Sequence, residues 1–124
     1  MLRKITDGEE HIYLAVGATD FRKQIPGLTA LVQSRFHLDP YSSACLFLFC
    51  NKKRTAMKAL RYDSNGFLLA SKSLLDDQKF LWPKSKEEIR DITSTQFEWL
   101  LQGIEIDQKH TLHSVDISSE NTCF

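Results

Sequence analysis

Cations gathered in one stretch of the chain are the residues best suited to chemistry. Residues 51–90 contain ten Lys and Arg against five Asp and Glu, whereas residues 1–50 are balanced at five of each. The remaining residues carry an excess of five acids, so the formal net charge of the whole chain is zero. A region of one sign gives a neutral molecule a positive side, which attracts polyanions.

The chemistry that these cations offer is contact with phosphate groups, which is independent of base sequence and weakens with salt. Lys52, Lys53 and Arg54 follow one another behind an apolar run, and Arg22 and Lys23 lie in the turn "GATDFRK". A solvated loop is the competing interpretation. The predicted nucleic-acid-binding residues are Arg22, Lys23, Lys52, Lys53, Arg54, Arg61 and Lys72.

The turn "GATDFRK" has two interpretations of its own. A strand that ends at Gly17 could expose backbone N–H groups to a phosphate, with Arg22 forking onto the phosphate oxygens. Against this, Asp20 repels an anion, and Pro26 places the helix start later in the chain. An ordinary capping turn with solvated cations therefore stays open as the alternative.

Enzymatic chemistry finds little support in the sequence. Asp20, Asp63 and Glu87 or Glu88 could be cast as ligands of a two-metal site, but no spacing predicts that they converge. For none of the four histidines does the sequence predict a nucleophile or carboxylate partner. We therefore expect no catalytic residue, no metal and no other cofactor.

Cysteine usage and hydropathy predict a cytoplasmic location. The three cysteines are odd in number and form no CxxC pair, which is typical of reduced, buried thiols. The first ten residues, "MLRKITDGEE", lack the apolar centre of a signal peptide, and no apolar run approaches the roughly 20 residues of a membrane span.

The elements that must position the cations fit one domain, expected over residues 1–106. Residues 11–18 and 44–50 are predicted strands, the second covered on both faces because its apolar run "ACLFLFC" is continuous. Pro26 and the apolar spacing behind it predict a helix over residues 26–36.

A β-hairpin is predicted behind the basic run. Asn65-Gly66 is the strongest short-range hairpin signal, because both residues accept positive φ in a type I′ turn. The signal predicts strands at about 56–64 and 67–75, although "KRTAMKAL" alone has helical propensity. The resulting register pairs Ser64 with Phe67, Tyr62 with Leu69, and Leu60 with Ser71.

This register predicts which hairpin side chains share a face. Arg61 and Lys72 become diagonal neighbours on one face, within reach of long side chains. They would then extend the surface begun by the loop cations. The opposite face, which is expected to pack in the core, collects Leu60, Tyr62, Phe67 and Leu69.

The rest of the chain supplies a connector, a second helix and a tail. "FLWPKSKEEIRDI" is predicted as a connector packed by Trp82, followed by a helical turn. Thr93 and Gln96 fit a capping box and Gly103 a helix stop, which predicts a helix at about 94–102. The fold class is thus α+β, a mixed and mainly antiparallel sheet of about four strands, with a flexible polar tail at 107–124.

Several motifs in a fixed order resemble a known family. They are "YLAVGATDFRKQIPGLTALVQ", "FLFCNKKR", "SNGFLLASKSL", "FLWP" and "FEWLLQGI", and they cover roughly residues 11–106. The chain resembles the TnpB accessory proteins of the bacterial insertion-sequence family sixty-six, which are distinct from the RNA-guided nucleases of the same name. The family pattern has Met where Phe21 stands, often Gly at Gln24, and often Trp at Tyr62.

The resemblance implies an accessory factor encoded beside a separate transposase, with no established chemistry of its own. The expected function is therefore non-catalytic help in transposition, with contact to nucleic acid, expected to be DNA, through the basic loop and hairpin face. The expected partners are the transposase of the same element and nucleic acid. An adaptor that binds the transposase without touching nucleic acid is the alternative function.

Overall fold

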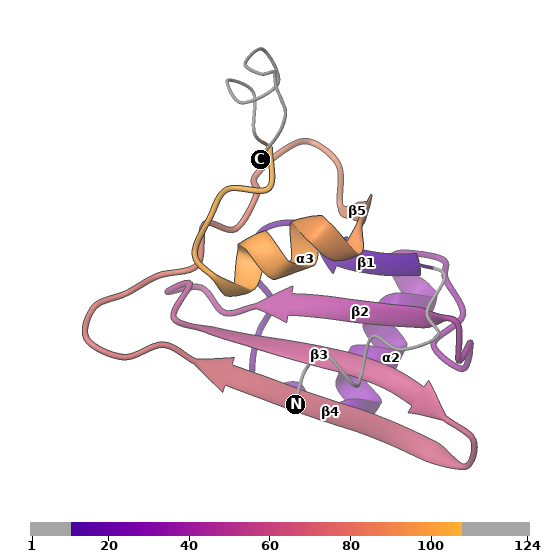
Figure 1. The fold of residues 1–124 in the computed structure, drawn as a ribbon. Coiled ribbons are helices and arrows are strands. Elements are labelled where there is room, and N and C mark those ends of the chain that lie inside the picture. The colour runs from indigo at the N-terminus through magenta and orange to yellow at the C-terminus, as the bar shows by residue number, and fades with distance from the viewer. Residues whose placement is uncertain (1–10, 108–124) are drawn as a thin grey trace.

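The structure, a computed structural model, describes residues 11–107. One sheet with the strand order β4-β3-β2-β1-β5 lies between two helices (Figure 1). Within these residues, no helix is long and apolar enough to cross a membrane. The elements are β1 (His11–Ala15), α2 (Ile25–Ser34), β2 (Cys45–Cys50), β3 (Ala56–Asp63), β4 (Gly66–Ser73), β5 (Ile89–Ile92) and α3 (Ser94–Leu101).

The sheet is mixed and mainly antiparallel, so the predicted α+β class is confirmed. β1 and β2 run parallel, and α2 lies in the crossover that parallel neighbours require. Every other neighbouring pair of strands is antiparallel. β2 occupies the centre, and Leu46 to Cys50 are all buried, as its continuous apolar run predicted.

Alternation along β2 sends side chains into two cores, one on each face of the sheet. Phe47 and Phe49 pack with Leu28 and Val32 of α2 on one face. α3 covers the other face, where the core consists of Ile12, Leu14, Leu46, Leu48, Cys50, Met57, Ala59, Phe80, Trp82, Ile92, Phe97, Leu100 and Ile106. Burial on both faces explains why β2 lacks the polar alternation of a surface strand.

The hairpin is present, but its turn lies one residue earlier than predicted, so each predicted cross-strand partner is wrong by two residues. Asp63 pairs with Gly66, so the loop residues are Ser64 and Asn65, and Ser64 takes the positive φ of 52°. This register sets Tyr62 opposite Phe67 and Leu60 opposite Leu69 on the α2 face. Apolar and aromatic cross-strand pairs stabilise a sheet, and here they outweigh the turn preference of Asn-Gly.

The predicted core face of the hairpin nevertheless agrees with the structure, because the shift keeps the alternation of faces. Leu60 is fully buried, and Phe67 and Leu69 pack against the same cluster. Tyr62 and Phe67 meet edge to face with ring centroids 5.2 Å apart, and Tyr41 adds a third ring.

The fifth strand was not predicted. β5 pairs antiparallel with β1 at the edge of the sheet, setting Ile12 opposite Ile92. This segment was expected to be part of a connector with a helical turn, and that expectation is wrong. Four residues show too little alternation to reveal a strand, and Ile92 is held there by burial against the α3-side core.

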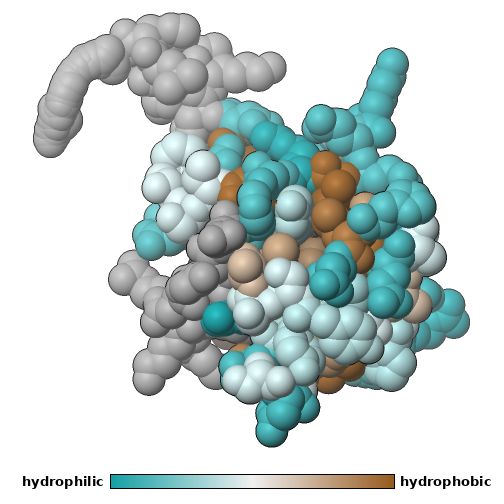
Figure 2. All heavy atoms as spheres, turned by 90° about the vertical axis from the view of Figure 1, so that its right-hand side faces the viewer, coloured by the Kyte–Doolittle hydropathy of each residue, from teal (hydrophilic) through white to brown (hydrophobic). Residues whose placement is uncertain are grey.

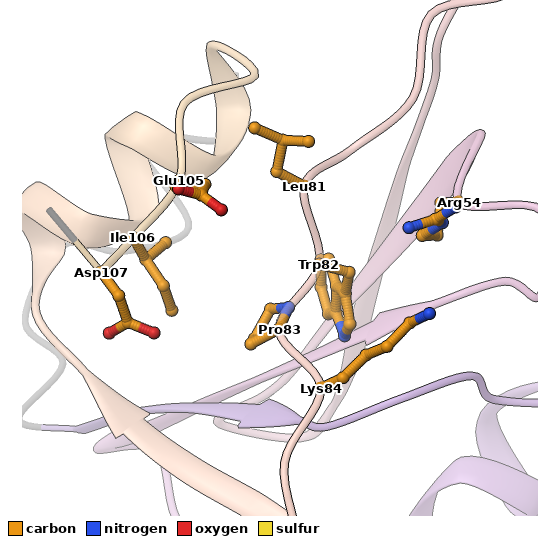
Figure 3. A pocket seen from close by; sticks show the side chains of 8 residues that line it. All are labelled: Arg54, Leu81, Trp82, Pro83, Lys84, Glu105, Ile106 and Asp107. Atoms are coloured by element: carbon orange, nitrogen blue, oxygen red, sulfur yellow. The ribbon is translucent and has the colours of Figure 1, made fainter. Parts of the chain in front are cut away.

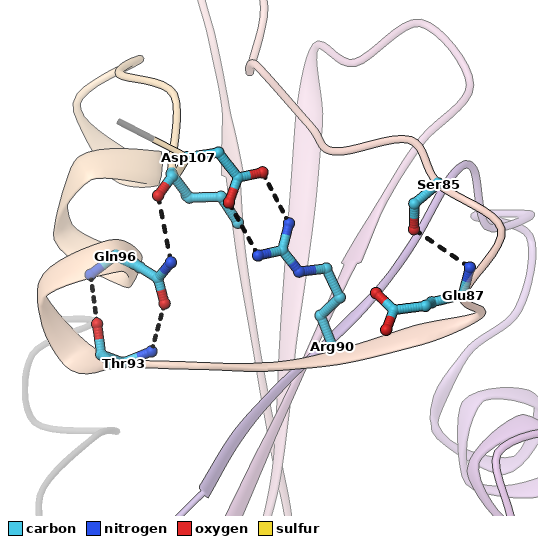
Figure 4. A network of polar contacts seen from close by, with 7 residues as sticks. Ser85, Glu87, Arg90, Thr93, Gln96 and Asp107 are labelled. Atoms are coloured by element: carbon cyan, nitrogen blue, oxygen red, sulfur yellow. Dashed lines mark hydrogen bonds and ion pairs between the residues drawn. The ribbon is translucent and has the colours of Figure 1, made fainter. Parts of the chain in front are cut away.

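Both predicted helices are present with shorter bounds, and α3 has the predicted capping box. Thr93 Oγ1 accepts a hydrogen bond from Gln96 N at 3.0 Å, and Gln96 Oε1 accepts one from Thr93 N at 2.9 Å (Figure 4). Gly103 follows the helix with a φ of 81°, as a C-terminal stop requires.

The same capping residue fastens the last described segment to the domain. Gln96 Nε2 donates to Ile106 O at 3.2 Å, and the guanidinium of Arg90 donates to both carboxylate oxygens of Asp107 at 2.9 Å (Figure 4). The tail prediction therefore applies beyond Asp107, and residues 108–124 lie outside the described residues.

Removing the cap should weaken the domain measurably. Thr93→Ala is expected to lower the free energy of unfolding by about 1 kcal/mol, because the N-terminal amides of α3 lose an acceptor. Urea unfolding followed by circular dichroism measures the change. Thr95→Ala, at an exposed threonine two residues further along the chain, is the matched control, and equal stability of the two variants would contradict the prediction.

Candidate nucleic-acid interface

Two basic loops leave the sheet at the same edge because β1 and β2 are parallel. The loop after β1 spans residues 16–24, and the loop after β2 spans residues 51–55. Thr19 N donates to Cys50 O at 2.7 Å, which joins the first loop to the end of β2. The carboxyl edge of parallel strands is also where open sheets commonly bind ligands.

A third loop, the connector of residues 74–88, crosses the same edge on its way from β4 to β5 (Figure 1). Phe80 N donates to Arg54 O at 2.8 Å, and Trp82 Nε1 donates to Ala15 O at 2.8 Å in a buried position. Two further backbone bonds join Val16 N to Glu88 O and Gly17 N to Pro83 O.

We call the cations of residues 16–24, 51–55 and 80–88 the basic edge, the last range being the part of the connector that Phe80, Trp82, Pro83 and Glu88 join to the other two loops. The structure thus brings together five of the predicted residues and adds two lysines that the sequence analysis missed. "PKSK" lies inside the positive stretch of residues 51–90, but only the path of the connector shows that it returns to the other loops. The basic edge consists of Arg22, Lys23, Lys52, Lys53, Arg54, Lys84 and Lys86.

Asn51 shapes the loop that presents the adjacent lysines. Its Oδ1 accepts hydrogen bonds from Thr55 N at 2.9 Å and Ala56 N at 3.1 Å, and its backbone oxygen accepts from Arg54 N. These bonds close a tight turn in which Lys52 and Lys53 are exposed.

Helix α2 begins at the same edge and adds to its positive potential. Its first turn contains no acidic residue, and Gln24 at the N-cap makes no side-chain capping bond. The amide groups of a helix start carry about half a positive charge. A Cβ on Gly27 would meet Lys23 Cβ at 3.0 Å, so the stem of Lys23 packs closely on this first turn.

Arg22 and Asp20 form a forked ion pair at the rim of the edge. Arg22 Nη2 lies 2.7 Å from Asp20 Oδ2, and the Arg22 side chain is 91 % exposed. The hydrogen bonds from Arg22 lower the pKa of Asp20 to about 2. Asp20 thus stays ionised above this pH and partly neutralises the cation beside it.

The ion pair predicts a defined pH effect. Because the folded-state pKa of Asp20 lies below the usual 3.8, its stabilising contribution is present above about pH 4 and is lost as the pH falls toward 2. Asp20→Asn is expected to remove this part of the acid sensitivity. Thermal unfolding at pH 2, 3, 4 and 6 measures it, with Asp39→Asn as the control, and identical pH profiles of wild type and Asp20→Asn would refute the prediction.

Lys58 supports the first loop from beneath instead of facing outward. Its Nζ donates to Phe21 O and Lys23 O, both at 3.1 Å, and lies 4.8 Å from the centre of the Phe21 ring. The ammonium group therefore holds residues 21–23 in place and is directed at the protein's own carbonyl groups.

The structure does not bring Arg61 and Lys72 together, so their prediction as diagonal neighbours is wrong. Arg61 pairs with Leu68, which is four residues from Lys72 and about 13 Å away along the strand. Lys72 Nζ donates to Leu101 O at 3.0 Å at the C-terminal end of α3. The shifted hairpin register separates the two cations.

Arg61 lies in the half of β3 nearer the hairpin turn, away from the basic edge. Figure 2 looks at the molecule from the side that carries this turn, and hydrophilic residues cover most of its surface, with apolar patches between them. Whether Arg61 and Lys72 contact nucleic acid stays a prediction.

A hollow of about 270 Å³ opens beside Arg54. Figure 3 shows Arg54 and Lys84 on one side, Glu105 and Asp107 on the other, and Trp82 and Pro83 between them. Leu81 and Ile106 complete the lining. The hollow therefore adjoins the basic edge and has charges of opposite sign on facing sides.

The described residues contain no group of three His, Cys, Asp or Glu side chains placed to hold a metal ion. The carboxylates considered as metal ligands lie in different parts of the fold, since Asp20 follows β1 and Asp63 ends β3 at the hairpin turn. Burial raises the pKa of the Cys50 thiol to about 12, which keeps it protonated and unreactive. Cys123 lies outside the described residues.

The described chain is thus a small α+β domain, with cations from three loops on one edge of a mixed sheet. The family model described as "IS66 Orf2 like protein" matches residues 10–111, and the chain belongs to this family. The family resemblance read from the motifs is therefore confirmed. The protein is an accessory protein of an insertion sequence.

Two proteins from Sinorhizobium fredii are similar to this chain, and their names state no function. "Uncharacterized protein y4jC" is 31 % identical over 94 residues, covering 76 % of this chain and 79 % of the relative. "Uncharacterized protein y4hO" is 32 % identical over 94 residues, covering 76 % and 80 %. No solved structure gives a significant match.

Proposed function

We propose that the protein assists transposition without catalysis by contacting the phosphate backbone of nucleic acid through the basic edge. The observation that carries the proposal is the convergence of three loops, fixed by backbone bonds such as Phe80 N to Arg54 O. Cations far apart in the sequence thereby form one surface, which a polyanion can contact at several phosphates.

The charge balance of the basic edge favours an anionic ligand. Within the three loops, residues 16–24, 51–55 and 74–88, eight Lys and Arg stand against five carboxylates, namely Asp20, Asp76, Asp77, Glu87 and Glu88. Two of these are already paired, Asp20 with Arg22 and Glu88 with Arg35 at 2.6 Å. The positive end of α2 adds to the excess.

The nucleic acid proposed is DNA of the element, and the protein partner proposed is its transposase. A salt titration of binding to a labelled duplex, read by fluorescence anisotropy, tests the contact. In a plot of log affinity against log salt concentration, contact with Z phosphates gives a slope of about −0.9Z. A slope between about −3 and −5 is expected, which corresponds to roughly three to six contacted phosphates. Absence of binding at low salt, where this attraction is strongest, would overturn the proposal.

A second candidate function is an adaptor that binds the transposase directly. β4 forms one outer edge of the described sheet, where backbone groups of an eight-residue strand have no strand neighbour. Leu68 on this strand is 44 % exposed. An extended segment of a partner can add to such an edge.

Capture of the transposase before and after nuclease treatment separates the two candidates. A complex that survives nuclease indicates direct protein contact and favours the adaptor. A complex that nuclease dissolves indicates that nucleic acid bridges the two proteins and favours the basic edge.

A further inference from the structure

We infer that β4 pairs antiparallel with β4 of a second copy of this chain, so that the two five-stranded sheets join as one. The inference goes beyond the proposed function and does not depend on it. β4 forms an outer edge of the sheet, and within residues 11–107 its one strand neighbour is β3. It is eight residues long, against about five or six for a usual strand.

The β4 edge lacks the features that keep other chains away from a sheet edge. Such protection comes from proline, from charged side chains, from bulges or from a very short strand. β4 contains no proline, and its register with β3 runs from Gly66 to Ser73 without a bulge. Its one charged residue, Lys72, is partly buried and donates Nζ to Leu101 O at 3.0 Å. The charge is therefore directed at the protein's own helix end and does not guard the edge.

The register with β3 shows which backbone groups of β4 point away from the sheet. Leu74 N donates to Thr55 O at 2.8 Å, which makes these two residues a hydrogen-bonded pair. Such pairs alternate along an antiparallel ladder, so every second residue of β4, counted back from Leu74, bonds to β3. The backbone groups that point outward therefore belong to Phe67, Leu69, Ser71 and Ser73.

These outward residues lie symmetrically about Ala70, which favours a second copy over another partner. A two-fold axis at Ala70 sets Leu69 opposite Ser71 of the partner subunit, and Phe67 opposite Ser73 of the partner subunit. Each of these pairs can exchange both of its backbone hydrogen bonds. One symmetric contact thus satisfies the outward backbone groups of all four residues in each copy.

Charge and side-chain size also permit two copies to meet along β4. The four outward residues have uncharged side chains, and the small Ala70 lies on the axis. The formal net charge of the chain is zero, so no long-range repulsion separates two copies. Leu68, which is 44 % exposed, would lie opposite Lys72 of the partner subunit, whose aliphatic stem can cover it.

The contact leaves the basic edge accessible in both copies. β4 runs in the same direction as β1 and β2, because two antiparallel steps separate it from β2. A two-fold axis normal to the sheet reverses this direction in the second copy. The two basic edges then lie at opposite ends of the joined sheet, so pairing of copies and contact with phosphates use separate surfaces.

Sedimentation over a range of protein concentrations tests the pairing. The wild-type chain is expected to reach twice the 14.3 kDa of one chain. Ser71→Pro removes an outward N–H from each copy and leaves the bonds to β3 in place, so the dimer should dissociate at least about tenfold more readily. Ser71→Thr keeps the N–H at the same position and should pair as the wild-type chain does. Circular dichroism checks that each variant is folded.

Leu68→Lys is a second variant that keeps the test decisive if Ser71→Pro does not fold. It sets a cation opposite Lys72 of the partner subunit at an exposed position, and it should also weaken the dimer.

Three results would overturn the inference. The first is a wild-type mass of one chain at every concentration. The second is a dimer that persists in folded Leu68→Lys and in every folded proline variant. The third is a single chain that captures the transposase and loses it on Ser71→Pro, which would assign this edge to the adaptor. A wild-type dimer that fails to bind duplex at low salt would overturn the proposed function alone.

Discussion

Replacing Lys52, Lys53 and Lys84 together with Gln is expected to flatten the salt dependence of nucleic-acid binding by up to about 2.7 slope units. The value follows if each lysine neutralises one phosphate, since each contact contributes about −0.9 to the log–log slope. The three side chains are exposed and come from two loops of one edge. Relative to 1 M salt, the lost slope corresponds to two to three orders of magnitude in affinity at 0.1 M, by the same relation.

The fold should tolerate this triple change, because exposed charges contribute little to stability. Arg61→Gln, made separately, tests the predicted contact of Arg61, which lies toward the hairpin turn, and a slope equal to that of the wild-type protein would place this half of β3 outside the interface. Anisotropy titrations from low to high salt give all three slopes. An unchanged slope in the triple variant would mean that the lysines are solvated loop residues, and the adaptor would become the first candidate.

Trp82→Ala is expected to lower the free energy of unfolding by about 3–5 kcal/mol, the usual cost of removing a buried aromatic side chain. Trp82 meets the ring of the fully buried Phe80 edge to face and donates to Ala15 O. A domain of this size has only about 5–15 kcal/mol in total, so the variant should be close to unfolding at 37 °C. Urea unfolding measures the loss.

Two further variants assign the cause of this loss. Trp82→Phe keeps an aromatic ring but leaves Ala15 O without its buried donor, so a smaller loss of about 1–3 kcal/mol is expected. Leu81→Ala, at the exposed neighbouring residue, should cost far less. If Trp82→Ala cost no more than Leu81→Ala, the connector would not be anchored by its tryptophan.

Local patterns predicted the central parts of the fold. The continuous apolar run of β2 reflects burial on both faces of the sheet, and the helical spacing behind Pro26 reflects burial of one face of α2. The capping box of Thr93 and Gln96 was predictable because its chemistry is confined to four residues.

Features that depend on distant contacts were not predictable in the same way. β5 has only four residues, and its strand form depends on pairing with β1 and on the burial of Ile92. The hairpin register depends on the pairing of Tyr62 with Phe67, which the dipeptide Asn65-Gly66 does not predict.

The candidate site was predicted in part for the same reason. Lys52, Lys53 and Arg54 were identified from the local excess of charge, and Arg22 and Lys23 from the turn behind the first predicted strand. Lys84 joins them only because hydrogen bonds bring the connector back to Ala15 and Arg54, and no local pattern indicates that path. No local pattern shows that Lys58, within the same positive stretch, directs its ammonium to Phe21 O and Lys23 O.

The crossing of residues 74–88 over the sheet edge also determines when the surface can form during synthesis. Trp82 and Ala15 are 67 residues apart, and Ile12 pairs with Ile92 across 80 residues. Contacts between such distant residues require costly loop closure and tend to form slowly. A growing chain therefore cannot assemble the three-loop surface until residues 80–88 have left the ribosome. Nascent chains shorter than this would expose their cations on separate, unordered loops, and only the finished domain would present them together.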